Sequence, residues 1–330
     1  MASIPLTARA EAHPHLRALN ILRDLPAVAD LIELCFSNTM DSDGQRYVQD
    51  MRRAGRDDSF LRWATKMTET TSLPLTGYIW EENGKIVGNA SLVPFRRKNE
   101  RIYLIANVAT HPDFRRRGIA RALTERALQH AVDRKVSATW LHVREDNPGA
   151  IKLYTELGFV ERARRTSWQA RGDLAAVSPQ TDINITTRTA RDWLQQQDWL
   201  RRLYPDILAW YHPWNFSALQ PGLLNWLYLA FVDMNVRQWS ALTGAGERLE
   251  AALAWIPYGR GANSLWLAAG PGASPEAVTS LLIHARRILL SGHAHLTLDY
   301  PASEASEAIR AAGFTAVRTL IWMEHTGATS

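Results

Sequence analysis

The stretch His111-Pro-Asp-Phe-Arg-Arg-Arg-Gly-Ile-Ala-Arg-Ala-Leu123 places three arginines directly before a glycine, Gly118. A helix is predicted to begin there, because apolar residues recur at helical spacing from that point on. These residues are Ile119, Ala122, Leu123 and Ala127. The N-terminus of a helix is already positive, so further cations there cost about 0.3 kcal/mol or more. We therefore expect an anion to bind at this turn.

The residue types in the turn fit a phosphate or a pyrophosphate group. Unpaired N–H groups at a helix start, a glycine that permits close approach and several guanidinium groups all favour such an anion. A Walker loop needs Gly-Lys followed by Ser or Thr, and a dinucleotide fold needs three spaced glycines. This turn has one glycine and no lysine, which excludes both. The alternative is a solvated cationic turn that binds no ligand.

Length and charge narrow the class of protein. The chain has 330 residues, which favours two domains, and its 46% hydrophobic and 22% charged residues are typical of a globular protein. The net charge is only +5, without a Lys/Arg-rich arm, so we expect no nucleic-acid partner. The histidines are scattered without the spacing of metal ligands, so we expect no metal site.

Cys35 is the only cysteine, which excludes an intramolecular disulfide and fits a reducing cytoplasm. We expect it to be a buried core thiol. The first twenty residues contain no apolar segment of the kind found in secretory signals. The strongest apolar run, residues 223–232, is too short to span a bilayer and is expected to be a buried helix or strand. We therefore expect a cytoplasmic protein without a membrane partner.

Helices and strands alternate along the first half of the chain. Asp24 can cap a first helix, and a polar region with a second helix follows it. Asn83-Gly84 predicts a β-hairpin between residues 78 and 93. The remaining predicted elements are a strand at 103–108, a helix at 118–133, a strand at 138–143, a helix at 147–157 and a strand at 160–169. A linker is expected over residues 172–187.

The second half repeats this order of elements. Strands at 248–256 and 264–268, a helix at 276–290, a strand at 296–298, a helix at 303–312 and a strand at 316–323 are predicted. Asp146-Asn-Pro148 aligns with Asp299-Tyr-Pro301, and Gly158-Phe159 aligns with Gly313-Phe314. We infer an internal duplication. The second copy has Gly270-Pro-Gly-Ala-Ser-Pro275 where the first has its arginines, so it has lost every cation of the turn.

Residues 115–120 fit the pattern Gln/Arg-x-x-Gly-x-Gly/Ala, and residues 147–159 fit Asn-x-x-Ala-x-x-Leu-Tyr-x-x-x-Gly-Phe at every named position. In this order and at this separation, the two motifs resemble those of the GNAT superfamily of acyl-CoA-dependent N-acyltransferases. The close resemblance covers residues 24–169. It implies an α+β (α/β mixed sheet) fold class with two tandem GNAT-like folds, each a mixed central sheet flanked by helices. Residues 1–175 would form the acyl-CoA-binding acetyltransferase domain and residues 176–330 a degenerate GNAT-like domain with a structural or acceptor-site role.

The resemblance also implies roles for particular residues. In the family, the end of the fourth strand pairs with the pantetheine arm of coenzyme A and the following turn holds the pyrophosphate. The strand residues would be Val108, Ala109 and Thr110. The turn residues would be Arg115, Arg116, Arg117, Gly118, Ile119, Ala120 and Arg121. Asn147 and Tyr154 would contact the cofactor as well, and acetyl-CoA or another acyl-CoA is the expected co-substrate.

Acyl transfer from a thioester to an amine needs a stabilised oxyanion, a proton for the leaving thiolate and a base for the amine. Tyr154 occupies the position of the family's usual general acid, and a phenol of pKa about 10 is protonated at neutral pH. The alternative for Tyr154 is a core residue beside Leu153 and Leu157. A backbone N–H near Val108 would polarise the thioester carbonyl.

The sequence assigns no general base. Many relatives place a carboxylate on the fourth strand, whereas residues 104–107 are Leu-Ile-Ala-Asn. Either an ordered water relays the proton or a base comes from elsewhere. His142 on the next strand and His111 at the turn are the nearby histidines, and each is expected to be structural or solvent-facing.

The expected function is a coenzyme-A-dependent N-acyltransferase that moves an acetyl or other acyl group to an amine in a ternary complex. A small-molecule amine is favoured over a protein as the acceptor. The alternative is a non-catalytic acyl-CoA-binding sensor or scaffold protein. The aromatic region 204–239 is expected to form either core or a wall for the acceptor.

Overall fold

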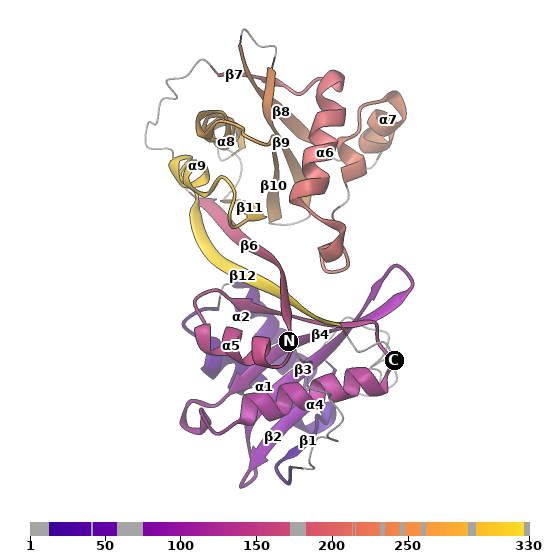
Figure 1. The fold of residues 1–330 in the computed structure, drawn as a ribbon, viewed down its shortest axis with the longest axis vertical. Helices are drawn as coiled ribbons and strands as arrows, with labels where there is room; N and C mark the ends of the chain where they lie inside the picture. The colour runs from indigo at the N-terminus through magenta and orange to yellow at the C-terminus, as the bar shows by residue number, and fades with distance from the viewer. Residues whose placement is uncertain are drawn as a thin grey trace. The chain divides into compact units, whose positions relative to one another are not determined.

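The computed structural model describes residues 13–40, 42–57, 75–171, 183–212, 214, 216–231, 235–244, 248–258, 262–289 and 295–326. Its first half contains β1 (Leu16–Ala18), α1 (Ile21–Phe36), α2 (Ser42–Ala54), β2 (Thr76–Glu82), β3 (Lys85–Arg97), β4 (Glu100–Thr110), η1 (Pro112–Phe114), α4 (Ile119–Asp133), β5 (Ala138–Arg144), α5 (Pro148–Glu156) and β6 (Val160–Arg171) (Figure 1). The helix predicted after the arginine turn is confirmed at α4.

The second half contains β7 (Asn184–Thr187), α6 (Trp193–Leu203), α7 (Leu223–Phe231), β8 (Arg237–Thr243), β9 (Arg248–Tyr258), β10 (Ala262–Ala269), α8 (Pro275–Leu289), β11 (His295–Pro301), α9 (Ser306–Ala311) and β12 (Thr315–Thr326). Short 3-10 turns lie at Ala190–Asp192, Asp206–Leu208 and Phe216–Leu219. Apart from these turns, the order of strands and helices is that of the first half. The predicted repeat is therefore confirmed.

Strand pairing repeats as well. In the first copy β1–β2, β2–β3 and β3–β4 are antiparallel and β4–β5 are parallel. In the second copy β7–β8, β8–β9 and β9–β10 are antiparallel and β10–β11 are parallel. A mixed sheet with helices in each copy confirms the α+β fold class.

The last strand of each copy lies beside strands of the other copy. One unit contains the described residues up to 143, residues 147–162 and those from 322 onward; the other contains residues 144–146 and 163–321. β12 is the sheet neighbour of β5, and β6 pairs with β11 from Arg165↔Pro301 to Arg171↔His295. The predicted domain boundary at 175/176 and most of the predicted linker lie outside the described residues.

Different helices cover the two faces of the sheet in the first unit. α1 and α2 form a buried cluster with Ile79 of β2. α4 covers the opposite face, where the Tyr78 hydroxyl lies 2.9 Å from Nδ1 of His130. A Cβ on Gly88 would lie 2.7 Å from the side chain of Ile119, so a glycine lets the start of α4 approach β3 closely.

The N-cap of α1 lies four residues before the predicted one, Asp24. Asn20 is the N-cap, and its side chain accepts the N–H of Leu22. Asp24 is buried inside the helix and forms an ion pair with Arg17 at 2.6 Å. The capping prediction for Asp24 was wrong because a buried carboxylate paired with an arginine gives the same sequence signal as a helix cap.

The core of the second unit contains much of its aromatic content. Trp193, Trp199, Trp239 and Trp255 are buried among the leucines and alanines of one cluster, and Tyr204 is fully enclosed in it. Within the aromatic region 204–239, Tyr204 and Trp239 belong to this core, whereas Phe231 is exposed. The described residues contain no helix that is long and apolar enough to cross a bilayer.

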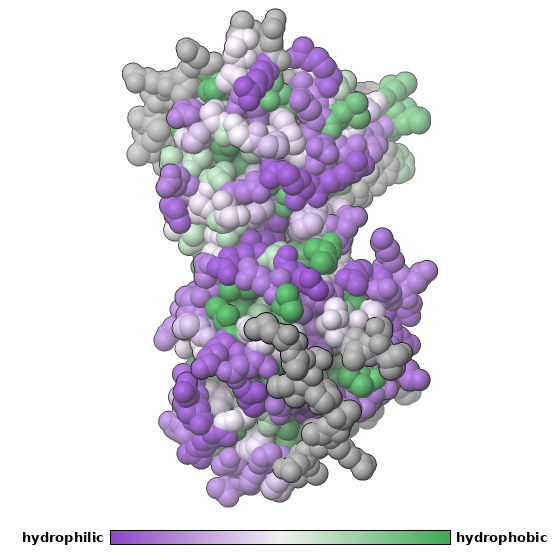
Figure 2. Space-filling model, in the orientation of Figure 1, coloured by the Kyte–Doolittle hydropathy of each residue, from purple (hydrophilic) through white to green (hydrophobic). Residues whose placement is uncertain are grey.

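The apolar run 223–232 forms α7, but the prediction that it is buried was wrong. Leu223, Leu224 and Phe231 are 70%, 84% and 89% exposed, and hydrophobic surface is visible where α7 lies (Figure 2). This short helix has a single polar residue, Asn225, and therefore lacks a polar face that would mark its solvent side. Its sequence therefore could not indicate which face packs on the unit.

Candidate active site

β4 contains a β-bulge near its end. Between the facing pairs Asn89↔Ala109 and Ser91↔Ala106, β3 has one residue, whereas β4 has two, Asn107 and Val108. Asn107 has φ +53°, and its carbonyl accepts a hydrogen bond of 2.8 Å from the buried side chain of Asn89. Its own side chain donates to the Tyr47 hydroxyl of α2 at 2.7 Å. Polar contacts from β3 and α2 therefore hold the bulge in place.

The pairing of β4 with β5 ends just before the bulge. The parallel register between them runs from Ile102↔Ala138 to Ile105↔Leu141, although β4 continues to Thr110 and β5 to Arg144. We call residues 106–110 and 142–144 the open strand ends. Unpaired N–H and C=O groups of this kind can bind an extended chain as an additional strand would. Val108, Ala109 and Thr110 all lie in this segment.

The carbonyl of Thr110 already has partners within the protein. It accepts hydrogen bonds from the Cys35 thiol and from Nε of Arg115, each at 3.3 Å. Cys35 is half-buried rather than fully buried as predicted, and burial raises the pKa of its thiol. The first arginine of the turn is thus tied to the end of β4.

The turn after β4 ends in an uncapped helix N-terminus. Gly118 has φ +80° and is the N-cap of α4, without a side-chain hydrogen bond to the helix. The first intrahelical bond runs from Ala122 N–H to the Gly118 carbonyl at 3.0 Å. The N–H groups of residues 118–121 therefore have no acceptor within the helix. A Cβ on Gly118 would meet nothing within 4 Å, so its surroundings are open to a ligand.

The four arginines of the turn are not equivalent. Arg117 stacks on the Phe114 ring at 4.8 Å and donates to the Asp113 carbonyl at 3.2 Å. Arg121 pairs with Glu156, which joins the start of α4 to α5. Arg116 is exposed and has φ +63°, and it forms no such contact with the described residues. The side chains of Arg115, Arg117 and Arg121 thus shape the turn, while Arg116 extends into solvent.

Asn147 and Tyr154 both lie on α5. Asn147 is its N-cap and accepts the Ala150 N–H at 3.2 Å. Tyr154 is 6% exposed, and its ring meets that of Phe159 edge-on with centroids 5.9 Å apart. Burial raises the pKa of the Tyr154 phenol, so it is protonated at neutral pH. No hydrogen bond joins its hydroxyl to another described residue.

The strand register places His142 beside the bulge. Tyr103 of β4 faces α4, where its ring centroid lies 5.6 Å from that of His130. Successive side chains of a strand point to opposite faces of the sheet. The residues of β4 on either side of Tyr103, and the β5 residues paired with them, therefore face α1 and α2. His142 lies on that face too, one residue beyond the last β4–β5 pair. It is half-buried and lies in the open strand ends. Only the register shows that His142 and the bulge share a face.

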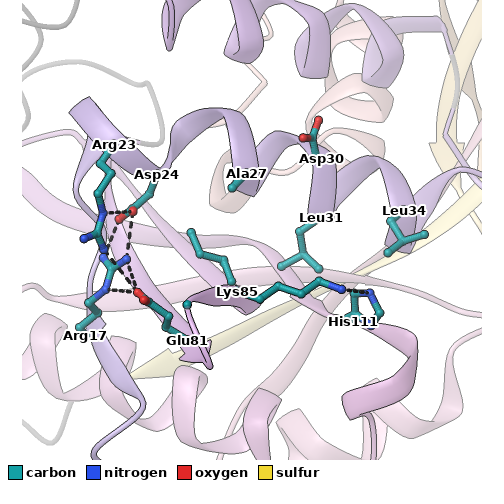
Figure 3. Close-up of a pocket in the computed structure, with 12 residues that line it drawn as sticks. Arg17, Arg23, Asp24, Ala27, Asp30, Leu31, Leu34, Glu81, Lys85 and His111 are labelled. Carbon is teal, nitrogen blue, oxygen red and sulfur yellow. Dashed lines mark hydrogen bonds and ion pairs between the residues drawn. The ribbon is translucent and has the colours of Figure 1, made fainter.

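His111 lies apart from the open strand ends. Its Nε2 is 3.1 Å from Nζ of Lys85, and both line a surface pocket of about 600 Å³ beside α1 and the β2–β3 turn (Figure 3). At the other end of the pocket, Arg17 is paired with Asp24 and Glu81. Among residues 111–121, all of which the structure describes, His111 alone lines this pocket. The pocket and the candidate cofactor site are therefore distinct.

In the second copy, a tyrosine side chain bonds the strand backbone at the position that corresponds to the bulge. The last β10–β11 pair is Leu265↔Leu298, and Leu267 follows it by two residues, as Asn107 follows Ile105. The Tyr204 hydroxyl accepts the N–H of Leu267 at 3.2 Å and donates to its carbonyl at 3.3 Å. Over its described residues, the β9–β10 register contains no bulge.

The start of α8 is closed as well. The Ser274 hydroxyl accepts the N–H of Ala277 at 3.3 Å, which caps the helix. The Ser274 N–H donates to the buried carboxylate of Glu250 at 2.9 Å. A protein carboxylate thus lies where the first copy offers free N–H groups. Within the described ranges, no group of three metal-ligating side chains is present in either copy.

Comparison with known proteins agrees with this geometry. Residues 30–159 match the Acetyltransferase (GNAT) family. The [ribosomal protein bS18]-alanine N-acetyltransferase of Escherichia coli strain K12 is 40% identical over 67 residues, which are 20% of this chain and 45% of that protein. The mycothiol acetyltransferase of Geodermatophilus obscurus is 34% identical over 131 residues, which are 38% of this chain and 36% of that protein. The matches thus span less than half of either relative.

A solved structure shares the fold over nearly the whole chain. The GCN5-related N-acetyltransferase from Sphaerobacter thermophilus superposes with a TM-score of 0.53 at 14% identity, covering 95% of this chain and 96% of that one. This likeness supports the fold of both copies. Residues 30–159 thus resemble the Acetyltransferase (GNAT) family, and the solved structure shows a similar fold over both copies.

Proposed function

We propose that the first copy is a coenzyme-A-dependent N-acyltransferase, with acetyl-CoA as the donor. The observation that carries this proposal is the continuity of the open strand ends with the uncapped start of α4. An extended thioester arm can pair with the backbone of Val108–Thr110, while a diphosphate accepts the N–H groups of residues 118–121. The residues present therefore fit coenzyme A.

The reaction follows from the groups around the bulge. The acceptor nitrogen attacks the thioester carbonyl; a C–N bond forms, the C–S bond breaks and the thiolate of coenzyme A leaves. A backbone N–H of the bulge stabilises the oxyanion, a contribution of a few kcal/mol in other enzymes. Tyr154 gives its proton to the leaving thiolate. The amine must lose a proton as well, and that proton needs a base.

We assign the base to His142. It lies on the face of α1 and α2, beside Asn107 and the bulge, whereas His111 lines the separate pocket. A neutral imidazole can accept this proton. His142 and Tyr154 then provide base and acid from neighbouring elements, β5 and α5.

The acceptor we propose is a small-molecule primary amine. The longer of the two sequence matches is to a protein named for mycothiol, a small molecule, and the bS18 relatives are named for a ribosomal protein. A panel containing both small primary amines and a peptide with an N-terminal alanine separates these two classes. Acetylation of the peptide alone would overturn the small-molecule assignment.

The test is acetyl-CoA cleavage by the full chain against that panel. Tyr154→Phe is expected to lower kcat about 100-fold while leaving coenzyme A affinity unchanged, because a general acid contributes roughly 10²–10⁴-fold. The matched control is Tyr211→Phe, which removes a phenol from the second unit. If the wild type binds coenzyme A but turns over no amine, the chain is a sensor or scaffold instead.

A further inference from the structure

The second copy supplies a strand to the first unit. Residues of β12 from Trp322 onward belong to that unit, and β12 is the sheet neighbour of β5. β5 carries His142, and α5, which comes after it in the chain, carries Tyr154. The last strand of the degenerate copy therefore lies next to the element that carries the proposed base. A catalytic role for β12 thus rests on the proposed function and extends it.

Trp322 lies against the proposed base. Its side chain is 2% exposed, and the centroid of its ring is 4.9 Å from that of His142, with the planes at 58°. A buried indole fixed by packing limits the orientations of a neighbouring imidazole. Trp322 is therefore placed to set the direction in which His142 presents its ring.

The opposite face of β12 is connected to the proposed acid. The His325 ring meets Phe159 edge-on at 5.5 Å, and Phe159 meets Tyr154 at 5.9 Å. A Cβ on Gly158 would lie 3.4 Å from the His325 ring, so this turn packs closely on β12. Successive residues of a strand face opposite sides, so one strand can support groups on both faces of the sheet.

A buried carboxylate fixes the register of β12. Glu324 is 5% exposed and accepts from Nε of Arg162 at 2.9 Å and from Arg97 at 3.5 Å. A buried charge needs such partners, so a shift of the strand would leave it unpaired. A shift by one residue would also turn Trp322 and His325 to the wrong faces. The ion pairs thus specify which side chain meets which catalytic group.

We infer that β12 is a positioning element of the active site, in which Trp322 orients His142 and His325 supports Tyr154 through Phe159. The second copy thereby takes part in catalysis by the first, although its own cofactor positions are closed. Trp322 is a positioning residue, because it acts on the substrate only through His142.

The test compares Trp322→Leu with Trp322→Phe in the full chain. Trp322→Leu is expected to lower kcat about 10-fold and to displace the acidic limb of the kcat–pH profile, with the dissociation constant of coenzyme A unchanged within about twofold. Trp322→Phe keeps an aromatic ring and is expected to restore most of kcat. Val317→Ala, at a 43% exposed position of β12, is the matched control and should resemble the wild type.

A second readout needs no turnover. NMR titration of ¹³C-labelled histidine, with the His142 signal assigned from a His142→Gln variant, is expected to show a changed His142 pKa in Trp322→Leu and an unchanged one in Val317→Ala. A titration and pH profile of Trp322→Leu identical to those of the wild type would overturn the inference. Absence of any turnover by the wild type would instead overturn the proposed function, and the titration would still decide the role of Trp322.

Discussion

The two copies begin their corresponding helices in opposite ways. α4 starts at Gly118, without a side-chain cap and after three arginines, whereas α8 is capped by Ser274 and has Glu276 in its first turn. Each copy faces the same requirement, because the first N–H groups of a helix need acceptors. The second copy satisfies it with its own hydroxyl and the carboxylate of Glu250. The first copy leaves these groups open, together with a surplus of positive charge.

This difference indicates how one fold can present open backbone groups in one copy and closed ones in the other. A backbone site is closed by placing a single polar side chain against it, as Tyr204 does at Leu267. No change of fold is needed. The unpaired N–H groups at the start of α4 are unfavourable without a ligand. We expect the diphosphate of coenzyme A to supply the missing acceptors.

The largest effect is expected when the charge is removed from the open turn. Replacing Arg115, Arg116 and Arg117 together by Ala should weaken coenzyme A binding about 100-fold, because charge-assisted hydrogen bonds contribute about 1.5–3 kcal/mol each. Calorimetric titration measures the change. The turn would then resemble its uncharged counterpart in the second copy.

The control removes three charges elsewhere. Arg53, Arg56 and Arg201 are exposed and lie outside the turn, so their replacement by Ala lowers the net charge equally. We expect at most about a twofold change in affinity, because these residues are not part of the turn and exposed charges are screened by salt. Equal losses in the two triple variants would mean that coenzyme A responds to net charge alone.

A smaller effect is expected from one methyl group at the helix start. Gly118→Ala should weaken coenzyme A binding about 10-fold, because the added Cβ lies where the diphosphate approaches the backbone. Gly272→Ala is the matched control: Gly118 and Gly272 have φ +80° and +77°, and an added Cβ meets nothing within 4 Å at either. Both variants have the same backbone strain, so only the Gly118 variant should lose affinity.

Much of this site could be predicted from the sequence, because it depends on local patterns. The helix after Gly118 and the repeat of elements follow from apolar periodicity and turn residues. The exchange of β6 and β12 could not be predicted, since an element order does not specify which copy receives a strand. The contact of Trp322 with His142 follows from that exchange, so the sequence could not predict it either.

The bulge at Asn107 had no sequence signal either. Its extra residue is supported by Asn89 and Tyr47, which are distant in the sequence and meet it only in the folded unit. Asp24 and the exposed helix α7 were misassigned for a related reason. Burial depends on tertiary neighbours, which composition and periodicity do not specify.

The closed positions of the second copy should contribute to stability. Tyr204→Phe removes the group that bonds both polar atoms of Leu267, and an unsatisfied buried group costs about 1–3 kcal/mol. We expect a loss of about 2 kcal/mol in the free energy of unfolding, measured by urea denaturation. Binding of coenzyme A to the first copy should not change. New coenzyme A binding in this variant would show that Tyr204 alone closes the second site.

The same tyrosine predicts a dependence on alkaline pH. Burial raises the pKa of Tyr204 above that of a phenol in the unfolded chain, about 10. Above pH 10 the unfolded chain therefore releases a proton that the folded chain retains, and stability falls by up to about 1.4 kcal/mol per pH unit for this group. Tyr204→Phe should reduce the slope of stability against pH by that amount. Equal slopes in the two proteins would contradict the burial argument.

Hydrogen–deuterium exchange with and without coenzyme A tests the central claim most directly, because it reports on the backbone amides themselves. We predict slower exchange at residues 108–110 and 118–121 on addition of coenzyme A, and unchanged exchange at residues 266–277 of the second copy. Protection confined to residues 266–277, or no protection in either segment at millimolar coenzyme A, would contradict the account.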